Sequence, residues 1–126
     1  MSRQAIQPEG VAAPKPPYSP VVVSGDLVYT AGQVAFDAEG SLVGTTIEEQ
    51  TRQTLENVRA CLEAAGCTMD DVLKVNAYLA DLDGFAGYNA VYEEFFAKPY
   101  PARTSVGAAL PPGVLVEIEA VARRSA

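Results

Sequence analysis

The chain has 126 residues, which fits one compact domain spanning residues 1–126. Its 48% hydrophobic and 20% charged residues are ordinary for a globular protein, and the absence of histidine excludes a Ser-His-Asp triad, a Cys-His pair and any histidine-containing metal site. The formal net charge of -7 disfavours a nucleic-acid partner, because binding DNA or RNA depends on neutralising phosphates.

The first third of the chain predicts two β-hairpins behind a proline-rich arm. The prolines of residues 12–17 keep that arm extended on the surface. The β-branched and aromatic runs Val21–Ser24 and Leu27–Thr30 flank a Gly-Asp pair that is typical of a two-residue turn. A second hairpin is predicted from residues 34–36 and 42–43.

An amphipathic helix is predicted to follow Thr46. Thr46 and Glu49 form a capping box, in which each side chain can bond the other residue's backbone amide. Gly66 supplies the stop signal. Residues at three- and four-residue spacing form an apolar stripe: Ile47, Thr51, Leu55, Val58, Leu62 and Ala65.

The second half of the chain predicts a strand over residues 72–79 and then a second helix. Asp81 and Asp83 can cap that helix, and prolines 99 and 101 end it. Its aromatic stripe consists of Phe85, Tyr88, Tyr92 and Phe95. Strands over residues 103–106 and 114–121 complete the order β-β-β-α-β-α-β-β. This order predicts an α+β fold, a mixed sheet with two helices packed on one face.

The sequence shows no targeting or membrane segment. Residues 1–17 contain no apolar run of signal-peptide length, and no later stretch approaches the roughly 20 apolar residues of a membrane helix. The two cysteines, Cys61 and Cys67, lack the second ligand pair of a zinc site and predict free thiols in a reducing compartment. We therefore expect a cytoplasmic protein with no membrane partner.

Glu117 and Glu119 are the first candidates for chemistry. The two-residue period of a strand places both on one face, opposite Val116 and Ile118. That face is either simply solvated or functional, and a function requires a nearby cation. Arg103 could hold a small anionic substrate through its guanidinium fork while a glutamate handles protons. The alternative is a plain salt bridge between Arg103 and a glutamate.

Three further positions each allow two interpretations. Tyr18, between prolines 17 and 20, either lines a cleft or packs in a surface groove. Gly32, within residues 30–33, either lets a ligand approach backbone amides or marks a bulge. Asn89 is either an exposed helix residue or a substrate contact.

Taken together, six segments resemble the reactive intermediate deaminase family, RidA/YjgF. The two most specific are Pro-Ala-Arg at 101–103 and Val-Glu-Ile-Glu-Ala at 116–120, which occur in the family's order. The others lie at residues 17–19, 29–33, 61–66 and 88–96, and the last of these contains Asn-Ala-Val-Tyr-Glu-Glu-Phe-Phe. The resemblance covers nearly the whole chain.

The resemblance implies a chorismate-mutase-like α+β fold. It also implies a homotrimer whose sheets form a central barrel, with a small-molecule site in each cleft between subunits. Deaminating members of the family hydrolyse imino and enamino acids, such as 2-aminoacrylate and 2-iminopropionate, to 2-oxo acids and ammonia without metal or cofactor. The implied partners are therefore a small imino acid and two further copies of the chain.

Matching positions carry the family's site onto this sequence. Arg103 would grip the substrate carboxylate, and Glu117 would position or activate water. Tyr18 and Asn89 would wall the cleft, and Gly32 would offer backbone to the substrate. The Arg103 charge would lower the pKa of Glu117 whereas burial would raise it, and the sequence leaves that balance open.

The chain also departs from the family pattern. Ala31 stands where many deaminating members have Ser, and Ser105 where they have Cys, and both border the implied substrate pocket. Residues 97–101 look shorter than in archetypal members. These departures leave open a deaminase specialised for a larger enamine, such as an aminomuconate-type acid, or a regulatory member that binds metabolites without turnover. The endoribonuclease activity once attached to the family is disfavoured by the net charge of -7.

Overall fold

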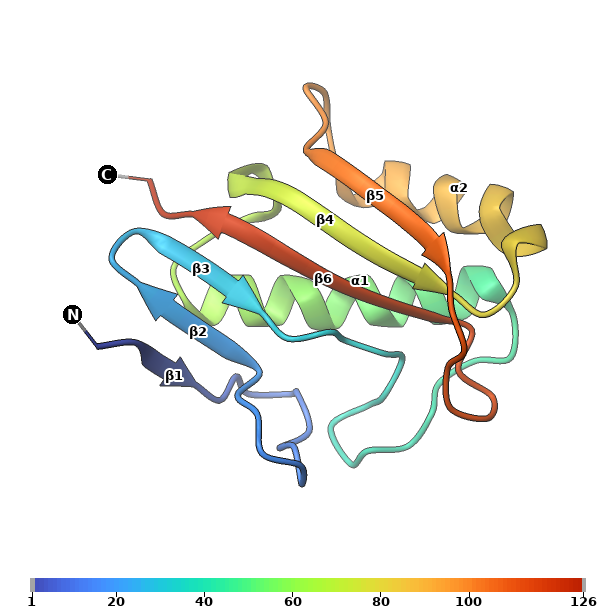
Figure 1. Ribbon diagram of the computed structural model, residues 1–126, viewed down its shortest axis with the longest axis horizontal. Helices are drawn as coiled ribbons and strands as arrows, with labels where there is room; N and C mark the ends of the chain where they lie inside the picture. The colour runs from blue at the N-terminus through green and yellow to red at the C-terminus, as the bar shows by residue number, and fades with distance from the viewer. Residues whose placement is uncertain (1, 126) are drawn as a thin grey trace.

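The computed structural model describes residues 2–125 as a six-stranded sheet covered by two helices (Figure 1). The strands are β1 (Gln4–Ile6), β2 (Val21–Ser24), β3 (Leu27–Thr30), β4 (Val72–Leu79), β5 (Ala102–Gly107) and β6 (Val116–Arg123). The helices are α1 (Ile47–Ala64) and α2 (Phe85–Phe95), with short 3₁₀ turns η1 (Met69–Asp71) and η2 (Leu82–Gly84). The strand order is β1-β2-β3-β6-β4-β5.

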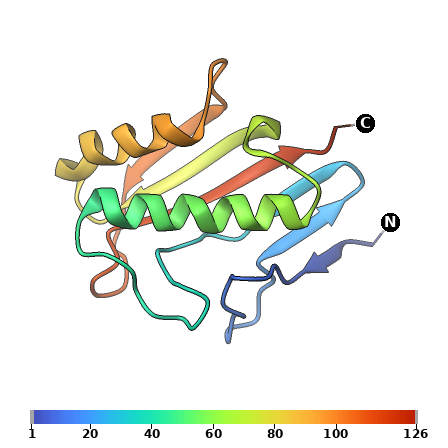
Figure 2. The ribbon, with the colours of Figure 1, turned by 180° about the vertical axis from the view of Figure 1, so that it is seen from behind.

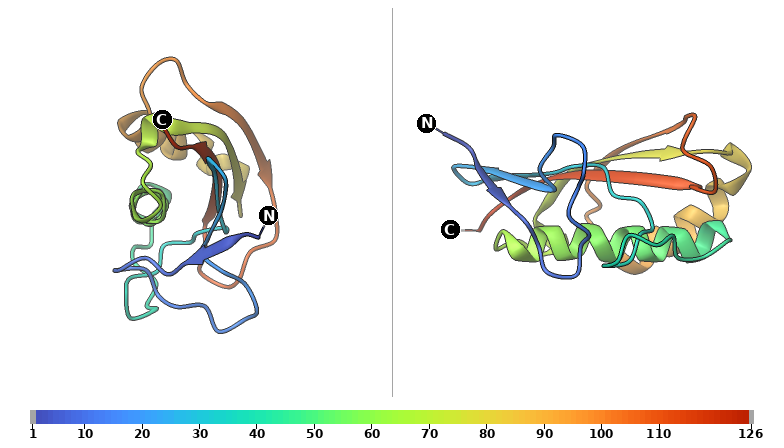
Figure 3. Two further views of the ribbon diagram at one scale, coloured as in Figure 1. Left: turned by 90° about the vertical axis from the view of Figure 1, so that its left-hand side faces the viewer. Right: turned by 90° about the horizontal axis from the view of Figure 1, so that it is seen from below.

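The sheet is mixed, because one of its neighbouring pairs is parallel. β4 and β5 run parallel, and the other pairs are antiparallel. A parallel pair needs a crossover between its strands, and α2 provides it. Both helices lie on the same face of the sheet, which leaves the other face open (Figures 2 and 3). The predicted α+β architecture is therefore confirmed.

The first predicted hairpin is confirmed, and the predicted turn pair joins β2 to β3. Val21 pairs with Thr30 and Ser24 with Leu27. Gly25 has φ 62°, a left-handed conformation that suits glycine and that this two-residue turn requires.

The second predicted hairpin is confirmed in part, since its two arms pair but form no regular strands. Phe36 and Leu42 make an antiparallel bridge, and the Val43 and Asp37 amides donate to the Ala35 and Ser41 carbonyl oxygens at 2.7 and 2.9 Å. On the other side of the first arm, Asn57 of α1 donates its side-chain amide to the carbonyl oxygens of Val34 and Phe36 at 3.0 and 2.8 Å. The helix therefore holds this short hairpin against the rest of the fold. The third strand of the first half is β1, which the sequence analysis missed.

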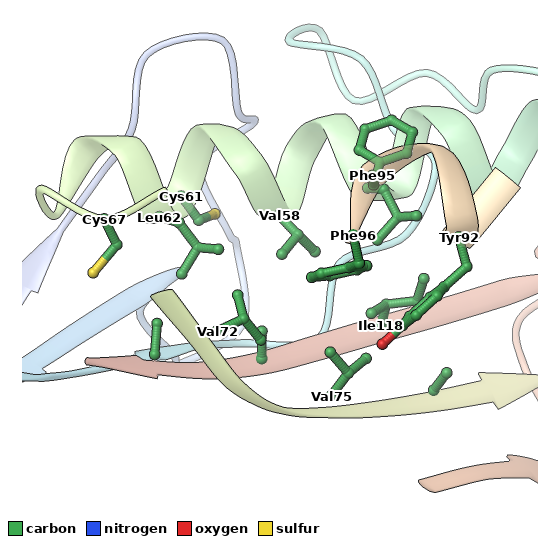
Figure 4. Close-up of a cluster of buried hydrophobic side chains, with 14 of the residues drawn as sticks. Val58, Cys61, Leu62, Cys67, Val72, Val75, Tyr92, Phe95, Phe96 and Ile118 are labelled. Carbon is green, nitrogen blue, oxygen red and sulfur yellow. The ribbon is translucent and has the colours of Figure 1, made fainter. Parts of the chain in front are cut away.

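The core lies between the sheet and the helices (Figure 4). Val58 and Leu62 of α1 pack toward Val75 of β4 and Ile118 of β6, and all four are fully buried. The aromatic face of α2 closes the same core. Both cysteines are free, as predicted, and both are buried. No helix within residues 2–125 has the length and apolar character to cross a membrane.

The capping box of α1 is formed as predicted, whereas α2 begins differently. Thr46 Oγ1 accepts from the Glu49 amide at 3.1 Å, and Glu49 Oε1 accepts from the Thr46 amide at 3.2 Å. Asp81 caps the 3₁₀ turn η2 instead of α2, since its Oδ1 accepts from the Asp83 amide. Gly84 precedes α2 without a side-chain cap.

Replacing Thr46 with Ala should destabilise the protein by about 1 kcal/mol, because the Glu49 amide loses its acceptor. The measurement is the free energy of unfolding in urea. Thr45→Ala is the matched control, since Thr45 is an exposed neighbour whose side chain makes no hydrogen bond within residues 2–125, and its effect should stay within about 0.5 kcal/mol. Equal costs for both variants would contradict the role of the cap.

Candidate functional site

Arg103 is an exposed cation whose guanidinium lies against the aromatic face of α2. Its Cζ atom is 4.7 Å from the ring centroid of Tyr92, 5.3 Å from that of Tyr88 and 5.6 Å from that of Phe85. Cation–π contacts of this length are attractive and restrict the orientation of a long side chain. The three rings therefore hold the guanidinium in place.

Asn89 completes the placement of Arg103. Arg103 Nη1 donates to Asn89 Oδ1 at 2.7 Å, and the two residues line a cavity of about 300 Å³ with Tyr92, Glu93, Tyr100 and Pro101. Within residues 2–125 Arg103 forms no ion pair with a carboxylate. The predicted alternative of a plain salt bridge is thus wrong, and most of the guanidinium N–H groups remain available to an anionic ligand.

Ser105 lies on the same face of β5, two residues beyond Arg103. Its Oγ is 3.1 Å from the hydroxyl oxygen of Tyr88, and it is partly exposed whereas Tyr88 is fully buried. Burial raises the pKa of Tyr88, against the opposing effects of Ser105 and of the Arg103 charge. Tyr88 is therefore a neutral phenol at physiological pH.

Tyr92 contributes only its ring to this site. Its hydroxyl points away from α2 toward the sheet and is buried without a hydrogen-bond partner in the described part of the chain (Figure 4). Burial raises the pKa of Tyr92 to about 12. The side chain therefore supports Arg103 as an aromatic surface and carries no proton to a ligand.

Glu117 lies in a different cavity, of about 380 Å³, on the open face of the sheet. Tyr18 and Gly32 line this cavity with it, together with Val34, Phe36, Pro111 and Val114. A Cβ atom on Gly32 would collide with the Glu117 carboxylate, since its distance to Glu117 Cδ would be 2.9 Å. The absence of a side chain at Gly32 therefore makes room for Glu117.

Tyr18 is one of the residues that line the Glu117 cavity, and Ala31 is not. Tyr18 is 51% exposed, so its phenol is accessible. The Ala31 amide donates to the Pro20 carbonyl oxygen at 2.8 Å. Between Ala31 and Gly32, Gly32 is therefore the residue whose backbone amide can bind a ligand.

Glu117 is half-buried beside a second carboxylate. Burial raises its pKa first, and the charge of Glu119 adds to that effect. Glu119 itself accepts from the Tyr78 hydroxyl at 3.1 Å and from the Asn76 amide at 3.4 Å. The sequence left open whether burial or the Arg103 charge decides the pKa shift of Glu117. Within this chain burial decides it, and the pKa is raised.

Arg103 and Glu117 lie on opposite faces of the sheet. Arg103 pairs with Val75 of β4, which faces the helices and is fully buried. Glu117 pairs with Tyr78 of β4, whose side chain bonds Glu119 on the open face. The predicted site residues therefore form two separate groups in one chain: Arg103, Asn89 and Ser105 on the helical face, and Tyr18, Gly32 and Glu117 on the open face.

Sequence reasoning missed the contribution of the aromatic residues to the site. Phe85, Tyr88 and Tyr92 were expected only as the core stripe of a helix, yet their rings hold Arg103. A signal was present, since Asn89 lies next to this stripe on the same helix. Within residues 2–125 no three His, Cys, Asp or Glu side chains lie close enough together to bind a metal ion.

Comparisons with known proteins match nearly the whole chain. The family model described as Endoribonuclease L-PSP matches residues 10–124. A RutC family protein of Pyrococcus horikoshii is 48% identical over 114 residues, 87% of this chain and 90% of the relative. The 2-iminobutanoate/2-iminopropanoate deaminase of Salmonella typhimurium is 41% identical over 125 residues, 96% of this chain and 98% of the relative. The crystal structure of Escherichia coli TdcF with bound serine has a TM-score of 0.90 at 37% identity, covering 97% of this chain and 99% of that one.

Replacing Gly32 with Ala should cost about 0.5–1.5 kcal/mol of stability, because the added methyl group forces the Glu117 side chain out of its rotamer. In a Glu117→Ala background the same change should cost at least about 0.5 kcal/mol less, since the colliding carboxylate is gone. Urea unfolding of the four proteins in this cycle measures both costs.

Gly107→Ala is the matched control for this cycle. A Cβ there would meet Leu82 at 3.4 Å, an ordinary contact, so the change should be nearly neutral. An equal cost of Gly32→Ala in both backgrounds would contradict the packing of Glu117 over Gly32.

Proposed function

The chain belongs to the RutC/YjgF/RidA family, described as Endoribonuclease L-PSP, and from that membership we propose that it is an imine deaminase whose site forms between copies of the chain. The observation that carries the proposal is the division of the site. A carboxylate-binding Arg103 and a carboxylate of raised pKa, Glu117, each line an open cavity on a different face. Each half lacks what the other provides.

The names of relatives support this reaction class. Salmonella and Dermatophagoides farinae relatives, 41% and 40% identical, are named 2-iminobutanoate/2-iminopropanoate deaminases. TdcF is a structural neighbour that holds serine, a small acid whose carboxylate is the kind of group a guanidinium binds. In the proposal, the ligand of Arg103 is likewise a small 2-imino acid.

In the proposed reaction, a 2-imino acid and water give a 2-oxo acid and ammonia. The substrate carboxylate binds the free N–H groups of Arg103, which orients the imine carbon. The oxygen of a water molecule adds to that carbon while Glu117 of a second copy takes a proton from the water. The nitrogen takes up the proton held by Glu117 and then the proton of the added hydroxyl group, the C–N bond breaks, and the new C=O bond forms as ammonia leaves. The imine carbon is already electrophilic, so orientation and a proton acceptor suffice.

Three copies in a ring would repeat such a cleft three times, which is the arrangement we propose. The open sheet faces would then line the centre of the trimer. Tyr18 and Gly32 would face Asn89 and Ser105 across each cleft. Because both cysteines are free and buried, we place the protein in the reducing cytoplasm.

RNA cleavage is not the function that the site favours. The net charge of -7 opposes the approach of a polyanion. A single guanidinium on an aromatic surface instead suits one small carboxylate. A purified protein that degrades RNA and releases no ammonia from imino acids would count against the proposal.

Removing either half of the site should abolish activity, and mixing the two variants should restore part of it. Arg103→Ala and Glu117→Gln should each lower kcat/KM for 2-iminopropanoate by about a hundredfold or more, because each loses a charge-assisted contact. Co-refolded in equal amounts, they should regain about a quarter of wild-type activity, since that share of clefts combines an intact Arg103 with an intact Glu117.

Two controls accompany the mixing experiment. Arg59→Ala removes an exposed guanidinium that stacks on Phe95, away from both cavities, and should keep wild-type activity. Each inactive variant refolded alone should stay inactive. If the mixture also stays inactive while mixed oligomers form, the site does not combine two copies.

At acidic pH, the dependence of activity on pH should follow the ionisation of Glu117. A base acts when ionised, so kcat, which reports the enzyme with substrate bound, should fall as pH drops through a pKa that lies above the usual carboxyl value. Glu119→Gln removes a like charge and should move this acidic limb of the profile to lower pH. The pH profile of kcat with a fixed imino acid measures both effects. Glu63→Gln, which changes an exposed carboxyl group of α1 outside both cavities, should leave the limb in place.

A further inference from the structure

The hydroxyl pair of Tyr88 and Ser105 is not used by the proposed reaction. The two oxygens are 3.1 Å apart, and the ring of Tyr88 also lies 5.3 Å from the Arg103 guanidinium. A buried phenol and a partly exposed serine hydroxyl thus lie beside the guanidinium that binds the ligand carboxylate in the proposed function.

The direction of the hydrogen bond follows from burial. Tyr88 is fully buried, and its hydroxyl has Ser105 as its hydrogen-bonding partner in the described part of the chain. A buried phenol must use its O–H, so Tyr88 donates and Ser105 accepts. The proton of Ser105 is then left for another acceptor. Because Ser105 is partly exposed, that acceptor can be a ligand.

Ser105 and Arg103 meet different parts of one ligand. Arg103 extends from β5 to Asn89 on α2, whereas the short Ser105 side chain stays at the strand, where the Tyr88 hydroxyl reaches it. The Cα atoms of two such residues on a strand are themselves about 7 Å apart. A ligand whose carboxylate is bound to Arg103 therefore presents a later atom to Ser105. For a short 2-imino acid this atom is the substituent on C3, the carbon next to the imine carbon.

We propose that Tyr88 is a specificity-determining residue, which holds Ser105 as a hydroxyl donor and thereby selects short 2-imino acids that carry a hydroxyl group on C3. This inference rests on the proposed function, because it takes Arg103 as the carboxylate site. A C3 hydroxyl gives the Ser105 proton an acceptor. A C3 methyl group leaves that proton unpaired when the cleft excludes water, and such sites discriminate against the alkyl analogue.

Two stable 2-oxo acids of equal size test the selection. 3-Hydroxypyruvate and 2-oxobutanoate share the carboxylate and carbonyl groups and differ by a hydroxyl in place of a methyl group. Calorimetry on the wild-type protein should show about tenfold tighter binding of 3-hydroxypyruvate. Tyr88→Phe and Ser105→Ala should each reduce this preference to within about twofold, while 2-oxobutanoate still binds.

Tyr29→Phe is the matched control, since Tyr29 lies on β3 outside both cavities and is 46% exposed. It should keep the tenfold preference. Thermal unfolding of all variants checks that they fold, and Tyr88→Phe retains the ring that supports Arg103.

Each other outcome overturns the inference. Equal affinities in the wild type, or a preference that survives Tyr88→Phe, would show that the pair does not select the ligand. If Ser105→Ala weakened both acids equally, Ser105 would bind the carboxylate instead. Deamination of 2-iminopropanoate together with equal affinities would overturn this inference alone. If neither acid bound, or if Arg103→Ala still bound both, the proposed carboxylate site would be overturned as well.

Discussion

The placement of one guanidinium on a platform of aromatic rings is the interaction on which the site depends. Arg103 is exposed and has no carboxylate partner within residues 2–125, so its charge is available. A free arginine side chain would lose much rotamer freedom on binding a ligand. Here Tyr92, Tyr88 and Asn89 restrict it beforehand. The rings and Asn89 therefore fix the direction in which the exposed guanidinium points. A lone surface arginine has no such fixed orientation.

The strand order keeps this cation apart from Glu117. β4 lies between β5 and β6, and the registers of the two pairings place Arg103 on one face and Glu117 on the other. If both groups lay in one cavity of one chain, they would form an ion pair that occupies the place of a guest and lowers the pKa of the carboxyl group. Their separation keeps the guanidinium free of a carboxylate partner and the Glu117 carboxylate basic within one chain.

Local signals in the sequence predicted most of the fold. The Gly-Asp turn, the Thr46–Glu49 box and the three-to-four spacing of α1 act between near neighbours, so a sequence shows them directly. The second hairpin formed only as a single bridge, and Asn57, more than twenty residues away, ties its first arm to α1. β1 escaped notice because its three residues pair with β2 across the proline-rich arm. Both depend on contacts that no local pattern records.

The sequence predicted which residues belong to the candidate site, but not that they lie on two different faces of the sheet. Alternation in β6 correctly placed Glu117 opposite the core residues Val116 and Ile118. The edge strand β5 has no such alternation, since most of its residues are exposed, so nothing in the sequence assigned Arg103 to a face. The aromatic stripe of α2 likewise fitted a core helix, and only the packing of β5 beside it shows that the same rings also support a cation.

The raised pKa of Glu117 bears on how the proposed cleft would act. An unliganded Arg103 brought near Glu117 by a second copy would lower that pKa and weaken the carboxylate as a proton acceptor. A substrate whose own carboxylate binds Arg103 cancels most of this charge. Burial and Glu119 then dominate again, and both raise the pKa. In the proposed cleft the substrate would therefore restore the proton affinity of Glu117, and a cleft without substrate would hold a weaker base.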